Sequence, residues 1–252
     1  MEKTEIPKTK YGLSIYRNPN PEIFEIGVDE AGKGPMFGRV YAAAVVLPKD
    51  PEQEMFNYTD LRDSKKIKSL KKLKTTAEYI KENALAWAVS YCDEKEIDLI
   101  NIRQATFKAM HNAIESVVGQ LERLEQSKKD NLANLANVAN LANKSRMDIQ
   151  LMIDGNDFKP YMCMQGSMFL ALPHTCYEGG DNRFTSIAAA SILAKTERDI
   201  YILDLCEKNP ELKERYSIDT NKGYGTKKHL EGIQAFGITE WHRCSYGICK
   251  NY

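Results

Sequence analysis

Four acidic residues of this 252-residue chain occupy positions from which carboxylates can bind metal ions. Asp29 and Glu30 are adjacent and precede a glycine-rich turn, while Asp154 and Asp181 each stand beside glycines next to an apolar stretch. Hard divalent cations prefer oxygen ligands of this kind. Each acid also fits an ordinary structural role. Asp29 and Glu30 could simply be solvated surface residues, Asp154 could be a turn residue, and Asp181 could mark the start of a helix.

Together, the four carboxylates could hold two divalent ions about 3.5–4 Å apart. One ion would lower the pKa of a bound water and make it a nucleophile near neutral pH. The other ion would stabilise the charge that builds on a leaving 3′-oxygen. The reaction that this pattern predicts is phosphodiester hydrolysis that leaves a 5′-phosphate and a 3′-hydroxyl.

A strongly basic segment, residues 62–81, follows the first pair of acids. Its net charge is +6 because only Asp63 and Glu78 oppose eight basic side chains, which are Arg62, Lys65, Lys66, Lys68, Lys71, Lys72, Lys74 and Lys81. The whole chain is neutral, with 35 basic and 35 acidic residues, which argues weakly against a nucleic-acid-binding protein. The segment is either a solvated helix face or a surface that contacts phosphates.

The elements that must position these residues are predicted from apolar periodicity. Strands are expected at Glu22–Val28, Val40–Leu47, Ala84–Tyr91 and Asp148–Ile153. Helices are expected at Ser69–Asn83, from Ile102 past Val118, at 185–205 and at Lys227–Phe236, before a coil-like C-terminus. We expect Asp29 and Glu30 just beyond the first strand, where neighbouring side chains need not point to opposite faces as they do inside a strand.

Three regions are expected: an N-terminal extension outside the core (1–21), a catalytic core (22–205) and a C-terminal helical segment (206–252). Residues 131–143 repeat Asn-Leu-Ala with a period of three, so their apolar positions drift around a helix by about 60° per step. We interpret this stretch as an insertion, with a partner-binding helix as the alternative.

No apolar run approaches the roughly 18–20 residues that span a bilayer, and the first ten residues do not resemble a secretory signal. The six cysteines form no Cys-x-x-Cys pair, which argues against a structural zinc site. Buried thiols in a reducing, cytoplasmic compartment are expected.

Several blocks, in the same order along the chain, resemble the type 2 ribonuclease H family, especially bacterial ribonuclease HII. The opening block is Ile-Gly-Val-Asp-Glu-Ala-Gly-Lys-Gly-Pro at 26–35, and further blocks are Asp-Ser-Lys-Lys at 63–66, Asn-Ile-Arg-Gln-Ala-Thr at 101–106, Ile-Asp-Gly-Asn at 153–156, Gly-Gly-Asp at 179–181 with Ser-Ile-Ala-Ala-Ala-Ser-Ile-Leu-Ala-Lys at 186–195, and Asn-Lys-Gly-Tyr-Gly-Thr-Lys at 221–227 with His-Arg-Cys-Ser-Tyr at 242–246. The resemblance spans about residues 22–247.

This resemblance implies an α/β fold of the ribonuclease H-like type, with a mixed five-stranded sheet flanked by helices and a C-terminal helical segment that closes over the substrate. It implies an endoribonuclease that hydrolyses the RNA strand of RNA/DNA hybrids and cuts 5′ of single ribonucleotides in duplex DNA. It also implies that Mg²⁺ or Mn²⁺ is bound by Asp29, Glu30, Asp154 and Asp181.

The substrate contacts that the resemblance implies begin with the Gly32-Lys33-Gly34 segment, which would recognise the ribonucleotide's 2′-hydroxyl. Glycines allow backbone groups to approach a sugar closely, and the 2′-hydroxyl distinguishes RNA from DNA at a site. Tyr224 would pack on the deoxyribose beside the cut. Phosphate or backbone contacts are expected from Lys65, Lys66, Asn101, Arg103, Lys195 and Arg198, although the last two could instead pair locally with Glu197 or Asp199.

The chain departs from the family pattern at two positions. Lys33 stands where arginine is usual, and lysine keeps the charge but loses the planar guanidinium. Ribonucleotide selectivity is therefore preserved if recognition uses backbone atoms and weakened if it needs the guanidinium. Arg39 stands where proline is common, and we expect little effect from it.

Two other functions remain open from the sequence. One is a ribonuclease HIII-like enzyme that cuts hybrids but handles single ribonucleotides poorly, and the other is a non-catalytic module that binds hybrids. The Gly32-Lys33-Gly34 segment and Tyr224 favour the ribonuclease HII type over the HIII type, and a decayed site would lack an acid that is present here. A monomer is expected, and no motif for binding a sliding clamp is evident.

Overall fold

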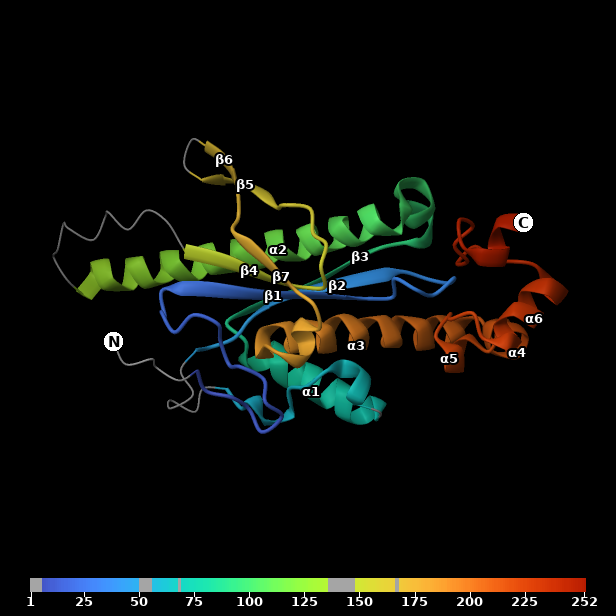
Figure 1. The fold of residues 1–252 in the computed structure, drawn as a ribbon, viewed down its shortest axis with the longest axis horizontal. Coiled ribbons are helices and arrows are strands. Elements are labelled where there is room, and N and C mark those ends of the chain that lie inside the picture. Colours follow the sequence, from blue (N-terminus) through green and yellow to red (C-terminus); the bar gives the residue numbers. More distant parts are fainter. Residues whose placement is uncertain (1–5, 50–55, 68, 136–147, 166–167) are drawn as a thin grey trace.

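A computed structural model describes residues 6–49, 56–67, 69–135, 148–165 and 168–252. Its centre is a five-stranded sheet with the strand order β3-β2-β1-β4-β7 (Figure 1). The strands are β1 (Ile23–Ala31), β2 (Val40–Val46), β3 (Ala86–Cys92), β4 (Asp148–Asp154) and β7 (His174–Tyr177). Because β1 pairs antiparallel with β2 and parallel with β4, the sheet is mixed, which confirms the expected fold class.

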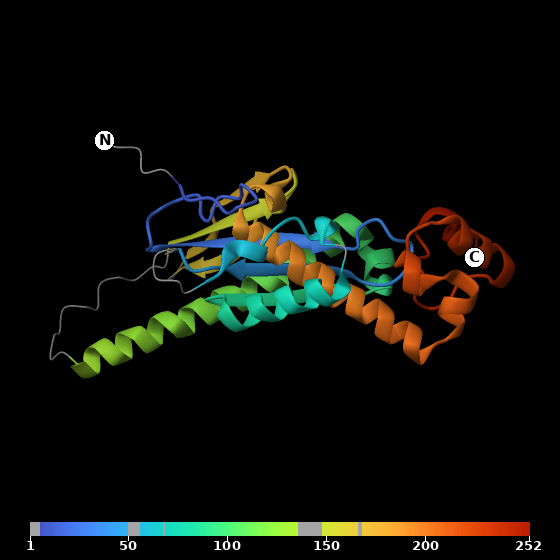
Figure 2. The ribbon, with the colours of Figure 1, turned by 90° about the horizontal axis from the view of Figure 1, so that it is seen from below.

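Helices cover both faces of this sheet (Figures 1 and 2). The long helix α2 (Glu94–Leu135) packs on one face, where Ile26 and Val28 of β1 join its apolar cluster. Helices α1 (Leu70–Asn83) and α3 (Thr185–Lys208) pack on the other face. Alternation along β1 therefore directs Gly27 and Asp29 towards α3.

Gly27 is the point at which β1 and α3 approach most closely. A Cβ atom on Gly27 would lie 2.2 Å from the carbonyl carbon of Ser186 and 2.5 Å from the amide nitrogen of Ile187. Only a residue without a side chain fits against the helix backbone at such distances. The first turn of α3 is thereby brought against the strand that carries Asp29.

The first strand is longer than predicted, and this corrects the placement of the acidic doublet. Asp29 and Glu30 lie inside β1, opposite Ala43 and Ala42 of β2, and pairing continues to Ala31. The two side chains therefore leave opposite faces of the strand. The prediction was wrong because the β2 backbone keeps the ladder closed beyond the last apolar residue of β1.

The helix predicted from Ile102 is confirmed, but it belongs to a longer element with an interruption. Asn101 has φ 66° and ψ 161° inside α2, a backbone conformation that residues other than glycine rarely adopt. Its side-chain oxygen accepts a hydrogen bond from the Gln104 amide at 3.1 Å. Asn101 thus caps the helical stretch that begins after it. Of the expected insertion 131–143, residues 131–135 continue α2, and the others lie outside the described residues.

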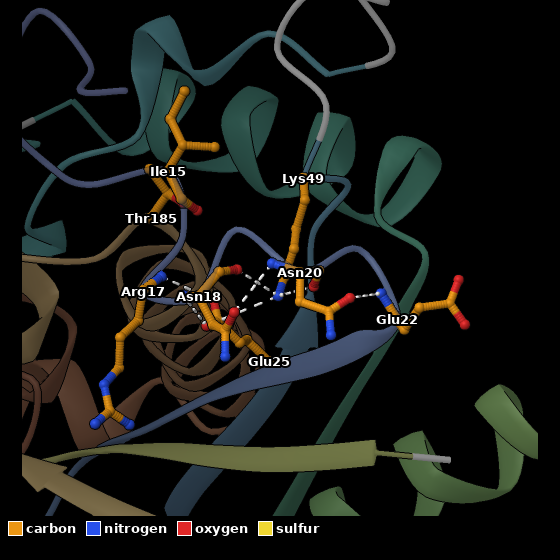
Figure 3. Close-up of polar contacts among 8 residues, drawn as sticks. All are labelled: Ile15, Arg17, Asn18, Asn20, Glu22, Glu25, Lys49 and Thr185. Carbon is orange, nitrogen blue, oxygen red and sulfur yellow. Dashed lines mark hydrogen bonds and ion pairs between the residues drawn. The ribbon is translucent and has the colours of Figure 1, made fainter. Parts of the chain in front are cut away.

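Residues 13–20 are bound to the core, which corrects the boundary expected for an extension over 1–21. Leu13 is 3% exposed. The Ser14 amide donates to the Arg183 carbonyl at 2.8 Å, and the Thr185 amide donates back to the Ser14 carbonyl at 3.1 Å. The Thr185 hydroxyl also donates to the Ile15 carbonyl at 2.8 Å (Figure 3). We call residues 13–20 the N-terminal arm.

A buried carboxylate on β1 holds the other end of this arm. Glu25 is 4% exposed and accepts hydrogen bonds from the backbone amides of Arg17 (3.0 Å) and Asn18 (2.6 Å) (Figure 3). The Lys49 ammonium donates to the carbonyls of Asn18 (2.9 Å) and Asn20 (3.1 Å). The arm therefore connects β1 to the start of α3 through backbone hydrogen bonds.

The C-terminal helices form a separate group around the far end of α3 (Figures 1 and 2). They are α4 (Glu211–Tyr216), α5 (Ile218–Asn221) and α6 (Lys227–Phe236), followed by a 3₁₀ turn, η4 (Gly247–Asn251). Their apolar cluster includes Ile202 and Cys206, so α3 continues across the boundary expected at residue 205. A short hairpin, β5 (Met162–Gln165) and β6 (Met168–Ala171), and the 3₁₀ turns η1 (Tyr58–Asp60), η2 (Ser64–Lys66) and η3 (Gly180–Asn182) complete the described elements. No helix within the described ranges is long and apolar enough to cross a membrane.

Candidate active site

The four acids predicted from the sequence meet around the ends of two neighbouring strands. Asp29 and Glu30 are in β1, Asp154 is the last residue of β4, and Asp181 is in η3. Because β1 and β4 are parallel, with Val28 opposite Ile153, their carboxyl ends lie side by side. The turn that holds Asp181 then follows β7, the neighbour of β4.

Backbone amides of η3 bind the Asp154 carboxylate directly. The Gly180 amide donates to Asp154 Oδ1 at 2.7 Å, and the Asp181 amide also donates to this carboxylate. A Cβ atom on Gly180 would lie 2.6 Å from the Ile187 side chain and 3.2 Å from Asp154 Oδ1. The second glycine of the Gly-Gly-Asp block is therefore explained by the close approach of this turn to Asp154.

The protonation equilibria of three of these acids show that they share one electrostatic environment. Burial raises the pKa of Asp29 well above its usual value, and repulsion by Glu30 and Asp154 raises it further. Burial and repulsion by Glu30 also raise the pKa of Asp154, and burial and repulsion by Asp154 raise that of Asp181. Hydrogen bonds from Ser191 and the Glu30 amide oppose the shift at Asp29 without cancelling it.

A cluster of mutually repelling carboxylates suits divalent cations, because bound positive charge would reverse each of these unfavourable terms. The donors are all hard oxygen atoms, as Mg²⁺ and Mn²⁺ require. Among the described residues, no group of three or more acidic, histidine or cysteine side chains is arranged so that it could hold a metal ion as it stands. The donor set fits the expected metal ions in its chemistry and charge.

Lys65 lies in the field of the same acids. Partial burial lowers its pKa, but attraction from Asp181, Asp29, Asp63 and Asp154 outweighs this effect, so the pKa is raised. Asp63 orients the segment because its carboxylate accepts the Lys65 amide at 2.9 Å. Lys65 thus lies near the acids, and its predicted contact with a phosphate stays a prediction. Lys66 lies in η2, and its side chain is outside the described residues.

The Gly32-Lys33-Gly34 segment leads away from β1 and carries its lysine back towards the acids. Lys33 Nζ lies 2.7 Å from Glu30 Oε1, and the lysine side chain is 51% exposed. The Lys33 side chain therefore pairs with Glu30, a candidate metal ligand. The backbone of the segment has other partners.

Arg243 holds this backbone and is the main residue that the sequence reasoning missed. Its side chain is fully buried and donates to four carbonyl groups of residues 32–38. The acceptors are the carbonyl oxygens of Gly32 (2.7 Å), Lys33 (3.1 Å), Pro35 (2.7 Å) and Gly38 (2.8 Å). The sequence signal was its place in the last family-like block, but the partner could not be read from it, since 211 residues separate Arg243 from Gly32.

Tyr224 lies beside the same segment, as expected. A Cβ atom on Gly34 would lie 3.4 Å from Tyr224 Cε1, and the ring is 52% exposed. Arg198, which was expected to face substrate or a neighbouring acid, is instead buried under Gly32 and donates to the Lys222 carbonyl at 2.7 Å.

Three other candidate contacts have protein partners. Lys195 pairs with Asp199 at 2.8 Å, which was the alternative prediction for it. Arg103 forms a two-point pair with Asp157 at 2.6 and 2.8 Å. Asn101 caps its helix as described above, and its role towards substrate stays a prediction.

Arg39 has a structural role, and the expectation that it has little effect stays a prediction. Its guanidinium carbon lies 4.1 Å from the ring centroid of Tyr91 and 4.4 Å from that of Tyr201. A proline would lose these cation–π contacts between β3 and α3.

Comparison with known proteins decides the family. The family model described as Ribonuclease HII matches residues 26–124 and 120–249. Ribonuclease HII of Bacteroides fragilis is 40% identical over 229 residues, which is 91% of this chain and 92% of the relative. The chain belongs to the ribonuclease HII family. As a member, it is an endonuclease that hydrolyses phosphodiester bonds in the RNA strand of RNA/DNA hybrids.

Solved structures show the fold of the ribonuclease HII family in this chain. Ribonuclease H2 from Pyrococcus horikoshii OT3 superposes with a TM-score of 0.62 at 17% identity, over 90% of this chain and 96% of that one. Ribonuclease HII of Archaeoglobus fulgidus, solved in complex with PCNA, gives 0.55 at 20% identity, over 89% and 95%. Bst-RNase HIII in complex with Mn²⁺ gives 0.51 at 18% identity, over 91% and 68%.

Proposed function

We propose that this enzyme also cuts 5′ of single ribonucleotides embedded in duplex DNA, and that Asp29, Glu30, Asp154 and Asp181 carry the reaction by binding two divalent ions. The observation that carries the proposal is the linkage of Asp154 to the turn of Asp181, by amide bonds and by mutual charge repulsion. Family membership and the Mn²⁺ complex of Bst-RNase HIII support the choice of Mg²⁺ or Mn²⁺.

The chain's own residues would orient the reactants around these ions. When bound, the ions supply a water of lowered pKa and neutralise charge on the leaving 3′-oxygen, so that a 5′-phosphate and a 3′-hydroxyl result. The amides of Gly180 and Asp181 hold the Asp154 carboxylate in place, and Ser191 does the same for Asp29. Lys65 lies within the field of the acids and supplies a positive charge for the adjoining phosphate.

The 2′-hydroxyl would be read by the backbone of Gly32, Lys33 and Gly34. Arg243 fixes the carbonyls of the first two residues, and the Tyr246 hydroxyl donates to the Lys33 carbonyl at 2.9 Å. The Lys33 ammonium pairs with Glu30, which supports recognition of the sugar by the backbone and not by the side chain at this position. Tyr224 would pack on the neighbouring deoxyribose.

Partners and compartment complete the proposal. Buried thiols at Cys92, Cys206 and Cys249 suit the reducing cytoplasmic location expected from the sequence. We propose a monomer, which size-exclusion chromatography with light scattering would test. The A. fulgidus relative, solved with PCNA, makes a sliding clamp a candidate partner although the sequence indicated none.

The deciding experiment compares two duplexes, one with a single embedded ribonucleotide and one a full RNA/DNA hybrid, in Mg²⁺ and then in Mn²⁺. We expect cleavage of both, with the cut in the first duplex on the 5′ side of the ribonucleotide. Cleavage of the hybrid alone would reject the proposed substrate and indicate the ribonuclease HIII-like alternative.

Replacing a carboxylate tests the residue assignment. We expect Asp29→Asn or Asp154→Asn to lower cleavage by about two to three orders of magnitude, since removing a group that stabilises transition-state charge costs roughly 10²–10³. Binding of the duplex, measured by fluorescence anisotropy without metal, should change little. Turnover near the wild-type rate in either variant would remove these residues from the site. Asp204→Asn is the control: Asp204 is exposed and is not one of the four acids, so this variant should retain activity.

A further inference from the structure

Two buried histidines lie behind Tyr224. His229 is in α6, His242 follows it in the chain, and their exposed fractions are 0% and 2%. His229 Nδ1 lies 2.9 Å from the Tyr224 carbonyl oxygen, the two Nε2 atoms lie 3.1 Å apart, and His242 Nδ1 lies 2.9 Å from the Thr239 amide nitrogen. A continuous line of hydrogen bonds thus runs from Thr239 to Tyr224.

The two ends of this line fix the position of every proton in it. A backbone amide can only donate, so His242 Nδ1 accepts and the proton of a neutral His242 is on Nε2. A carbonyl can only accept, so the proton of His229 is on Nδ1 and its Nε2 is free to accept. The central bond is then His242 Nε2–H donating to His229 Nε2, which is the arrangement that both ends require.

Both rings are kept neutral by their surroundings. Burial and repulsion by His229 lower the pKa of His242 to about 3, and burial lowers the pKa of His229. A proton added to His229 Nε2 would face the Nε2–H of His242 at 3.1 Å, and a proton added to His242 Nδ1 would face the Thr239 amide N–H at 2.9 Å. Phe37 packs edge-on against His242 with ring centroids 5.0 Å apart, so the pair is also in contact with the segment that follows Gly34.

We propose that His229 and His242 are positioning residues that set substrate selectivity: they form a neutral, one-directional relay that holds the Tyr224 backbone and so places its ring beside Gly34. The inference rests on the role proposed for Tyr224. Asn221 binds the other side of this turn, because its backbone carbonyl accepts the Tyr224 amide at 3.0 Å and its side chain accepts the Gly223 amide at 2.7 Å. On the α6 side, the Tyr224 carbonyl accepts the Thr226 amide at 2.7 Å as well as His229 Nδ1–H at 2.9 Å, so His229 adds a side-chain restraint to a backbone one.

The relay itself can be tested without any assay of activity. The chain has four histidines, so ¹⁵N–¹H correlation spectra of the imidazole rings are simple to assign with His111→Asn and His174→Asn variants. We expect His229 to show the Nδ1–H tautomer and His242 the Nε2–H tautomer, with neither ring protonated between pH 6 and 8. The opposite tautomer at either ring, or titration of either ring in this range, would overturn the relay.

A matched pair of variants tests the consequence for selectivity. In His229→Asn, the side-chain amide can still donate to the Tyr224 carbonyl from the place of Nδ1, although the contact with His242 is lost. In His229→Gln, the longer side chain can reach His242 from the place of Nε2 but no longer bonds Tyr224. Tyr224→Ala gives the full effect of losing the ring.

The readout is the ratio of kcat/KM for the single-ribonucleotide duplex to that for the full hybrid. We expect this ratio to fall about tenfold in His229→Gln, to approach that of Tyr224→Ala, and to stay within about threefold of wild type in His229→Asn. Loss of folded protein lowers both rates equally, so it leaves the ratio unchanged. An unchanged ratio in His229→Gln, or equal ratios in the two His229 variants, would overturn the proposal. A wild-type enzyme that ignores the single ribonucleotide would reject the proposed function instead, while the spectra still report on the relay.

Discussion

At the scale of single residues, Lys33 joins two parts of the site that have different tasks. Its ammonium neutralises Glu30 at 2.7 Å, and its carbonyl accepts hydrogen bonds from Arg243 and Tyr246. The side chain thus pairs with a candidate metal ligand, while the backbone is bound by Arg243 and Tyr246. Under the proposed role of the backbone in sugar recognition, lysine can stand here in place of the more usual arginine.

Replacing Lys33 should therefore change metal dependence more than selectivity. In Lys33→Met, we expect the Mg²⁺ concentration for half-maximal rate to fall about two- to fivefold, because an exposed ion pair contributes about 0.2–1 kcal/mol and no longer competes for Glu30. The preference for a ribonucleotide over a deoxyribonucleotide should change less than twofold. Mg²⁺ titrations of cleavage measure both.

Lys108→Met is the matched control, because Lys108 is also 51% exposed and pairs with an acid, Glu96, that is not among the four carboxylates. Its Mg²⁺ dependence should equal that of wild type. A large loss of ribonucleotide preference in Lys33→Met would show that the side chain, not the backbone, reads the sugar.

At the scale of elements, the contact between β1 and α3 determines where Asp29 lies relative to Ser191. Gly27 permits this contact, and Asp29 follows it on the same face of the strand. The N-terminal arm strengthens the same junction, since it bonds to Glu25 on β1 and to Thr185 at the start of α3. Three segments from distant parts of the sequence thus meet beside the acids.

A single methyl group should disrupt this junction. Gly27→Ala places a carbon atom 2.2 Å from the Ser186 backbone, and we expect a loss of about 3 kcal/mol or more in the free energy of unfolding, because the backbone of α3 has to move. Urea unfolding followed by circular dichroism measures the change.

Gly119→Ala provides the control in α2, where the nearest atom to the new Cβ is the end of the Arg123 side chain at 3.7 Å. That substitution should stabilise the protein by up to about 1 kcal/mol, since alanine favours the helix. If Gly27→Ala unfolds at the wild-type urea concentration, β1 and α3 do not pack as closely as described.

The elements that the sequence predicted well are those whose side chains carry the signal. The apolar run of β2 and the periodicity of α1 gave bounds within a residue or two, and α6 was predicted at Lys227–Phe236 as observed. The end of β1 and the N-terminal arm were missed because backbone hydrogen bonds, not apolar side chains, hold them. Strand β7 was not predicted for a similar reason, because its four residues show no alternation between buried and exposed side chains.

At the scale of the whole molecule, the site is assembled from both ends of the chain. The four acids could be named from the sequence because they lie in three of the family-like blocks. The support that Arg243 and the two histidines give to the loop and to Tyr224 could not be predicted, since it depends on contacts between residues far apart in the sequence. Sequence motifs identify chemically active residues, whereas only the fold reveals which residues hold them.

Stability towards acid should report on the buried histidine pair. A histidine whose pKa is lowered by folding contributes stability that is complete above its unfolded pKa, about 6.5, and is lost as pH falls towards the folded value, about 3 for His242. The slope reaches about 1.4 kcal/mol per pH unit for each proton taken up. The acids of the site act in the opposite direction, because their raised pKa values favour folding at low pH.

The two effects separate in a comparison of wild type with His242→Asn. Both proteins contain the same acids, so the difference between their free energies of unfolding isolates the histidine. We expect this difference to shrink as pH falls from 7 to 4, measured by urea unfolding at each pH. A difference that stays constant over this range would show that His242 is protonated in the folded protein as easily as in the unfolded chain.

The distance in sequence between Arg243 and Gly32 has a consequence for the newly made protein. At roughly 5–20 residues per second, a ribosome needs about 10 to 40 s to add the 211 residues that separate them. All four carboxylates have been synthesised before then, but the carbonyls of Gly32 and Lys33 still lack the guanidinium that binds them. In a growing chain the acidic residues are therefore made first, and the loop that follows Asp29 and Glu30 is fixed in place last.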